Sequence, residues 1–165
     1  SLAVALAYAA VTRQLMDDIS ALGCITTELT ELCKRYGFAY YRDWATVLDG
    51  WAEGGAAGLR GARAGIKSLE RDGSRARMTY WLSLAADLHR REGDTAAAAA
   101  VLDAATSAAI EHDDQWWLPE ILRVRAVLDP TPGRNRRLEQ AIALARSQSS
   151  VTLLERCRAD LGACD

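Results

Sequence analysis

The segment GLRGARAGIKS, residues 58–68, places three glycines ahead of a Lys-Ser pair and raises the question of a phosphate-binding loop. Such a loop reads GxxxxGK[ST] and follows a β-strand, so that backbone N–H groups at a helix N-terminus surround the anion. Here Ile66 separates Gly65 from Lys67, and the pattern predicts no preceding strand. We therefore expect Lys67 to bind no nucleotide. The glycines at 54, 58, 61 and 65 recur at the spacing of one helix face, which predicts close packing against a neighbouring helix.

Metal-binding and nucleophilic chemistry have few candidate residues. The sequence contains two histidines, His89 and His112, which lie on different predicted helices without a matching cluster of cysteines or carboxylates. The four cysteines form no CxxC pair, and we expect them to be reduced, buried, small apolar residues: Cys24, Cys33, Cys157 and Cys164. The sequence thus predicts no catalytic residue, no metal and no cofactor, and we expect a cytoplasmic protein that is not an enzyme.

Composition excludes several classes of partner. Half of the residues are apolar and the net charge is -2, so no overall field selects nucleic acid or an anionic membrane. Basic residues are in excess over 55–93 and acidic residues over 94–129, which is typical of adjacent structural units. The apolar opening SLAVALAYAAV is too short to span a bilayer. We expect no direct contact with nucleic acid or membrane, and the initial Ser indicates a fragment of a larger protein.

Apolar residues recur at three- and four-residue spacing between glycine-containing stops such as RYGF, EGG, RDGS and EGDT, and this is the helical period. A looser connection, DPTPGRN at 129–135, contains two prolines that forbid helix continuation. The predicted structure is all-α, in a single domain covering 1–165. The predicted helices span residues 2–15, 18–36, 38–53, 56–72, 75–92, 95–112, 116–128, 135–147 and 150–162.

Two segments of about 40 residues repeat one pattern, a long helix, a glycine turn, a second helix rich in small residues and a polar end. They begin at YYRDW and YWLSL. Aromatic residues gather on the first helix of each pair, whereas the second helices carry alanine and glycine. Short connections make successive helices antiparallel, and the repetition predicts hairpins stacked as an α-solenoid.

Several residues carry a resemblance to a known class of proteins. They are Phe38, DGWA at 49–52, Gly58, GIKSLERDG at 65–73, Tyr80, Ala85, EGD at 92–94, VLDAA at 101–105, Trp116, Glu120 and Arg123. Residues 38–128 resemble the tetratricopeptide-like helical region of large bacterial signalling proteins that join a class III adenylate cyclase or a LuxR-type regulator to a STAND-type ATPase. The resemblance implies a right-handed superhelix and a role in signal transduction. The ATPase and cyclase motifs of that family are absent from this sequence.

In such a superhelix the first helix of each pair lines the concave face, where a protein or peptide would lie. The partner expected there is another protein or another domain of the same protein. Stacking and charge-assisted hydrogen bonds would hold it, and the candidate binding residues are Tyr41, Arg77, Tyr80, Trp81, Trp117, Glu120 and Arg123. Two alternatives stay open: a small-effector sensor that controls an attached ATPase or cyclase, and a structural spacer or self-association unit.

Overall fold

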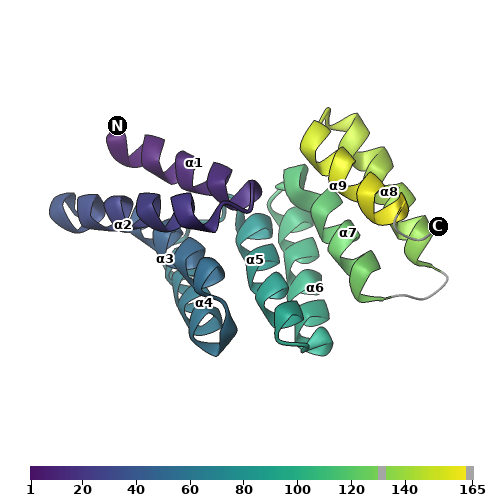
Figure 1. Ribbon diagram of the computed structural model, residues 1–165, viewed down its shortest axis with the longest axis horizontal. Helices are drawn as coiled ribbons and strands as arrows, with labels where there is room; N and C mark the ends of the chain where they lie inside the picture. Colours follow the sequence, from purple (N-terminus) through teal and green to yellow (C-terminus); the bar gives the residue numbers. More distant parts are fainter. Residues whose placement is uncertain (130–132, 163–165) are drawn as a thin grey trace. The chain divides into compact units, whose positions relative to one another are not determined.

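The computed structural model describes residues 1–129 and 133–162 of the chain. Helices make up nearly all of this part, and no strand occurs in it (Figure 1). The helices are α1 (Leu2–Leu15), α2 (Ile19–Tyr36), α3 (Ala39–Glu53), α4 (Gly55–Arg71), α5 (Met78–Arg91), α6 (Thr95–Glu111), the short 3₁₀-helix η1 (Gln115–Trp117), α7 (Leu118–Leu128), α8 (Arg134–Ser147) and α9 (Val151–Gly162).

These bounds confirm the predicted all-α class and the predicted helices. The largest difference is at α5, which begins at Met78 and not at residue 75. The cause is Arg77, whose backbone lies in the left-handed region with φ of 61° and so precedes the helix. The predicted helix over 116–128 begins as η1 and continues as α7. Of the looser connection at 129–135, residues 130–132 lie outside the described part of the chain.

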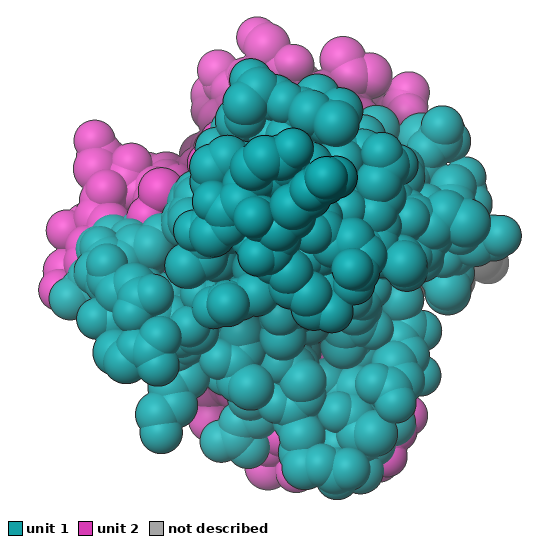
Figure 2. All heavy atoms as spheres, turned by 90° about the vertical axis from the view of Figure 1, so that its left-hand side faces the viewer, with its two compact units in different colours: residues 1–75 teal, residues 76–165 magenta. Residues whose placement is uncertain are grey.

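The chain divides into two compact units, unit 1 (Ser1–Arg75) and unit 2 (Ala76–Asp165), which Figure 2 colours separately. Unit 1 contains α1 to α4, and unit 2 contains α5 to α9. The single domain predicted over 1–165 stays a prediction.

Helix ends in both units follow the expected cap chemistry. The Asp18 side chain accepts a hydrogen bond from the Ala21 backbone N–H (3.1 Å) at the start of α2, and Asp94 accepts one from Ala97 (2.9 Å) at the start of α6. Gly37 ends α2 in the left-handed conformation, with φ of 74°. Because these caps turn the chain back within a few residues, consecutive helices become antiparallel neighbours.

Unit 1 is built by packing each helix against the next, and α1 also contacts α3. Its core contains Trp44 together with Leu22, Leu29 and Leu48, all almost fully buried. The seven-residue spacing of Leu22 and Leu29 places them on one face of α2, which explains why that face turns inward.

The closest approach in unit 1 is between α3 and α4, and glycines allow it. A Cβ atom on Gly50 would lie 2.5 Å from the Gly58 carbonyl oxygen, and one on Gly65 would lie 2.6 Å from the Val47 Cγ2. The predicted role of these glycines in helix packing is therefore confirmed at 58 and 65. It is wrong at Gly54, which joins α3 to α4 with φ of 69°, and Gly61 has room for a side chain because its nearest neighbour would be 3.6 Å away.

Unit 2 repeats this neighbour-by-neighbour packing, from α5 with α6 to α8 with α9. In addition α5 contacts α7, and α7 contacts α9. The buried face of α6 consists of small and apolar residues, Ala98, Leu102, Ala105 and Ala109. Alanine lets α5 approach closely, and the volume of the core comes from aromatic residues on α5 and η1.

Candidate interaction site

Four aromatic residues of unit 2 form one cluster where α5 meets η1. The ring of Tyr80 lies 4.7 Å from that of Trp81 and 5.1 Å from that of Trp117, in edge-to-face geometry. Trp116 lies 4.8 Å from Trp117 and 5.9 Å from Tyr80. Such pairs add to the stability that burial of the rings provides. The structure therefore brings together three of the residues that the sequence singled out, Tyr80, Trp81 and Trp117.

Burial changes the role of these three residues. Tyr80 and Trp81 are fully buried, and Trp117 is 3% exposed, with its Nε1–H donating a 2.7 Å hydrogen bond to the Ser83 hydroxyl. The expectation that these three rings stack on a partner is wrong, since they fill the core between α5 and η1. Burial also raises the pKa of the Tyr80 hydroxyl above its usual range, so this group stays neutral. Trp116, which the sequence did not place among the binding residues, is the accessible member at 39% exposure.

Glu120 and Arg123 of α7 form an ion-pair network that extends to α9. The Arg123 guanidinium donates from Nε and Nη2 to the two carboxylate oxygens of Glu120, both at 2.8 Å, and from Nη1 to Asp160. Arg156 donates to Glu120 at 3.3 Å. Because both partners are engaged, Glu120 and Arg123 join α7 to α9, and the expectation that they are available for a partner is wrong.

The energetics of the network follow from its partial burial. Burial alone would lower the pKa of Arg123, but the hydrogen bonds and charges of Glu120 and Asp160 outweigh it and raise that pKa above its usual value. The network also adjoins the aromatic cluster, because the charge of Arg156 acts on the Tyr80 hydroxyl. Removing one partner of such a partly buried ion pair is destabilising, because the other charge is left without compensation.

The two remaining candidates are both half-buried. Arg77 lies just before α5 in unit 2, and the Tyr80 N–H donates to its carbonyl oxygen at 3.0 Å. Tyr41 lies on α3 in unit 1, with its ring 5.6 Å from that of Trp44. The candidate residues thus belong to two units, and the structure assembles only those of unit 2 into one cluster.

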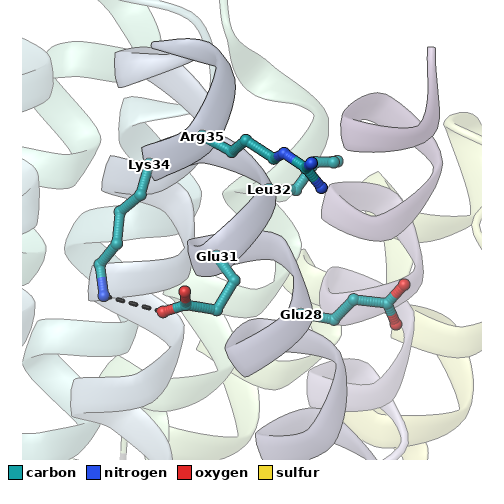
Figure 3. Close-up of a pocket in the computed structure, with 5 residues that line it drawn as sticks. All are labelled: Glu28, Glu31, Leu32, Lys34 and Arg35. Atoms are coloured by element: carbon teal, nitrogen blue, oxygen red, sulfur yellow. Dashed lines mark hydrogen bonds and ion pairs between the residues drawn. The ribbon is translucent and has the colours of Figure 1, made fainter.

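A surface that the sequence did not single out lies on α2. Glu28, Glu31, Leu32, Lys34 and Arg35 line an open hollow of about 540 Å³ (Figure 3). Beside it, the rings of Tyr36 and Phe38 stack at 6.0 Å and are 58% and 40% exposed. The Arg35 guanidinium lies 5.7 Å from the centre of the Tyr36 ring. The aromatic residues on either side of Gly37 could have indicated this surface from the sequence, because two large residues at a helix end are hard to bury together.

Reactive side chains are scattered through the described residues. No group of three or more His, Cys, Asp or Glu side chains comes together there in a way that would hold a metal ion. Cys33 and Cys157 are buried as predicted, but Cys24 is exposed, which corrects the expectation for that residue. Cys164 lies outside the described part. Burial, together with the charge of Glu120, raises the pKa of the Cys157 thiol to about 11, so this thiol is a poor nucleophile at neutral pH.

Comparison with known proteins assigns the chain to no family. No protein-family description matches the chain, and no solved structure is similar to it. The chain is similar to an uncharacterized protein of Rhizobium meliloti (strain 1021), with 27% identity over 158 residues. The match covers 90% of this chain and 15% of that protein, so the chain spans a small part of the length of its relative. Within the described residues, no helix has the length and apolar character needed to cross a membrane.

Proposed function

We propose that this chain is a non-catalytic helical-repeat module of a larger bacterial signalling protein, and that it binds a protein or peptide partner. The observation that carries the proposal is the packing within each unit. Each helix contacts the next, while α1 also contacts α3, α5 contacts α7 and α7 contacts α9. In stacked helical hairpins the first helices of successive pairs touch in this way. A tetratricopeptide-like superhelix is the arrangement that this pattern favours.

The proposed partner surface consists of accessible residues and not of the buried aromatic residues that the sequence singled out. Tyr80, Trp81 and Trp117 stabilise the core, so the contact falls on the residues around them that solvent reaches. These are Trp116, whose ring packs against the cluster, and the half-buried Arg77. An aromatic ring held by a rigid neighbour is a common anchor at interfaces, because little side-chain entropy is lost on binding.

A structural spacer or self-association unit is the second candidate, and the burial of the aromatic cluster favours it. A core that uses its aromatic residues internally leaves fewer of them for a ligand. The third alternative, a small-effector sensor, receives less support, because the hollow on α2 is open whereas small-molecule sites enclose most of their ligand.

Site-specific photo-crosslinking tests the docking proposal in the parent protein. A photoreactive phenylalanine at position 116 replaces one exposed aromatic ring by another, and the same residue at Ile110, an exposed position on α6, is the matched control. We expect a discrete crosslinked product from position 116 and none from position 110. Absence of a product from position 116 would reject the docking proposal and leave the spacer as the better candidate.

A further inference from the structure

The exposed stripe of α2 carries its charges in a self-complementary order. Glu28 and Glu31 come first along the helix, Leu32 follows, and Lys34 and Arg35 come last. Glu28, Leu32 and Arg35 are spaced four and three residues apart, so they lie on one face of the helix. Figure 3 shows Glu28 and Arg35 extending to the same side of α2, with Leu32 between them.

This stripe is accessible and hollowed. Glu28 and Arg35 are exposed, Leu32 is half-buried, and with Glu31 and Lys34 they line the hollow of about 540 Å³. Lys34 bonds Glu31 at 2.9 Å within the same helix, which leaves Glu28 and Arg35 as the outer charges of the stripe. Neither of these two side chains forms an ion pair with another described residue of the chain.

We propose that α2 pairs with α2 of a second copy of this chain, antiparallel and about a two-fold axis that passes beside Leu32. In that arrangement Glu28 faces Arg35 of the partner subunit, and Arg35 faces the partner's Glu28. An isologous interface requires that each contact occur twice in this reciprocal way. Leu32 and the partner's Leu32 lie near the axis and fill the two hollows with apolar side chains.

A further feature fits the same occupant. The aromatic pair of Tyr36 and Phe38 lies just beyond Arg35 and extends the interface with exposed ring area. A parallel arrangement would put Glu28 against the partner's Glu28, and repulsion between like charges excludes it.

Charge reversal provides a test with an internal rescue. E28R alone sets two positive charges against each other at both contacts, and R35E alone sets two negative charges against each other. Each variant should self-associate about tenfold more weakly than the original chain, because two ion pairs become two repulsions. In an equimolar mixture of the two variants, a mixed pair has opposite charges at both contacts. The mixture should therefore form a heterodimer. Sedimentation velocity and native mass spectrometry measure both results on the 165-residue chain.

Controls separate this interface from general charge effects. E70R and R63E reverse exposed charges on α4 and should leave self-association unchanged. Circular dichroism checks that each variant folds, and the neutral variants E28Q and R35Q should give a smaller weakening of the same sign. A chain that stays monomeric at about 100 µM, well above the micromolar range of a specific contact, would overturn the proposal. So would E28R and R35E variants that associate as the original chain does, or a mixture that forms no heterodimer.

This inference rests on the self-association candidate named above and supplies its surface. The two proposals can be rejected independently. If the chain is monomeric but position 116 still crosslinks a partner, the α2 pairing is wrong and the docking proposal stands. If the chain is dimeric and position 116 gives no crosslink, the docking proposal is wrong and the α2 pairing stands.

Discussion

At the scale of single residues, the glycines of α3 and α4 set how closely these helices approach. We expect Gly58→Ala to destabilise the protein by about 1 to 3 kcal/mol, because the added Cβ would overlap the carbonyl oxygen of Gly50. Gly61→Ala is the matched control in the same helix. Its Cβ finds 3.6 Å of clearance, and alanine favours the helix, so stability should stay equal or rise by up to about 1 kcal/mol. Urea unfolding of both variants gives the comparison; equal losses would contradict it.

Trp116 and Trp117 are neighbours in sequence with different roles in the fold. Trp117→Ala should cost about 3 to 5 kcal/mol, since it empties a core position and leaves the Ser83 hydroxyl without its donor. Trp116→Ala should cost clearly less, because that ring is 39% exposed. Thermal unfolding measures both. Similar melting temperatures for the two variants would show that Trp117 is not a core residue.

The Cys157 thiol makes stability sensitive to alkaline pH. Its pKa is raised to about 11 in the folded chain, against about 8.5 in an unfolded one, so the unfolded state loses its proton first. Stability should therefore fall as pH rises from about 8.5 to about 11, by up to about 1.4 kcal/mol per pH unit for this group. Cys157→Ala should make this slope shallower, whereas Cys24→Ala at an exposed position should not. Urea unfolding at a series of pH values tests the difference in slope.

At the scale of elements, the network of Glu120, Arg123 and Asp160 fixes α7 against α9. Glu120→Gln should destabilise by about 2 to 4 kcal/mol, because Arg123 and Arg156 lose a carboxylate in a partly buried place. Glu155→Gln changes an exposed carboxylate of α9 and should cost less than about 0.5 kcal/mol. Urea unfolding of the two variants measures the difference.

A double-mutant cycle checks that the network acts as a unit. Combining Glu120→Gln with Arg123→Gln should cost less than the sum of the two single changes, since each removes the same ion pair. Strict additivity would show that the two charges do not stabilise one another.

At the scale of the whole molecule, the division into two units predicts how the chain is cut. Arg75 is exposed and lies in the segment between α4 and α5, outside the helices of both units. Brief trypsin treatment should therefore cleave first between residues 71 and 77. The pieces 1–75 and 76–165, prepared separately, should both keep helical circular dichroism and unfold cooperatively, because each has its own core. A piece that is unfolded alone would show that its unit depends on the other.

The candidate site was only partly predictable from local pattern. Most of the candidate residues lie in unit 2, namely Arg77, Tyr80, Trp81, Trp117, Glu120 and Arg123, whereas Tyr41 lies in unit 1. Their availability was not predictable, because exposure depends on neighbours brought from distant segments. Arg123 finds Asp160 across 37 positions of sequence, and Trp117 finds Ser83 across 34.

The sequence by itself determined the helices, their ends and their order. Periodicity and glycine stops act over a few residues, and caps such as Asp18 and Gly37 need no distant partner. Only the tertiary structure decided which face of each helix is covered, which glycines touch a neighbour and which charges pair. Gly61 and Gly65 are alike in the sequence, yet Val47 packs against Gly65 and not against Gly61. The physical reason is that burial and contact depend on the residues of both surfaces that meet, whereas the local sequence of one helix specifies only one of these surfaces.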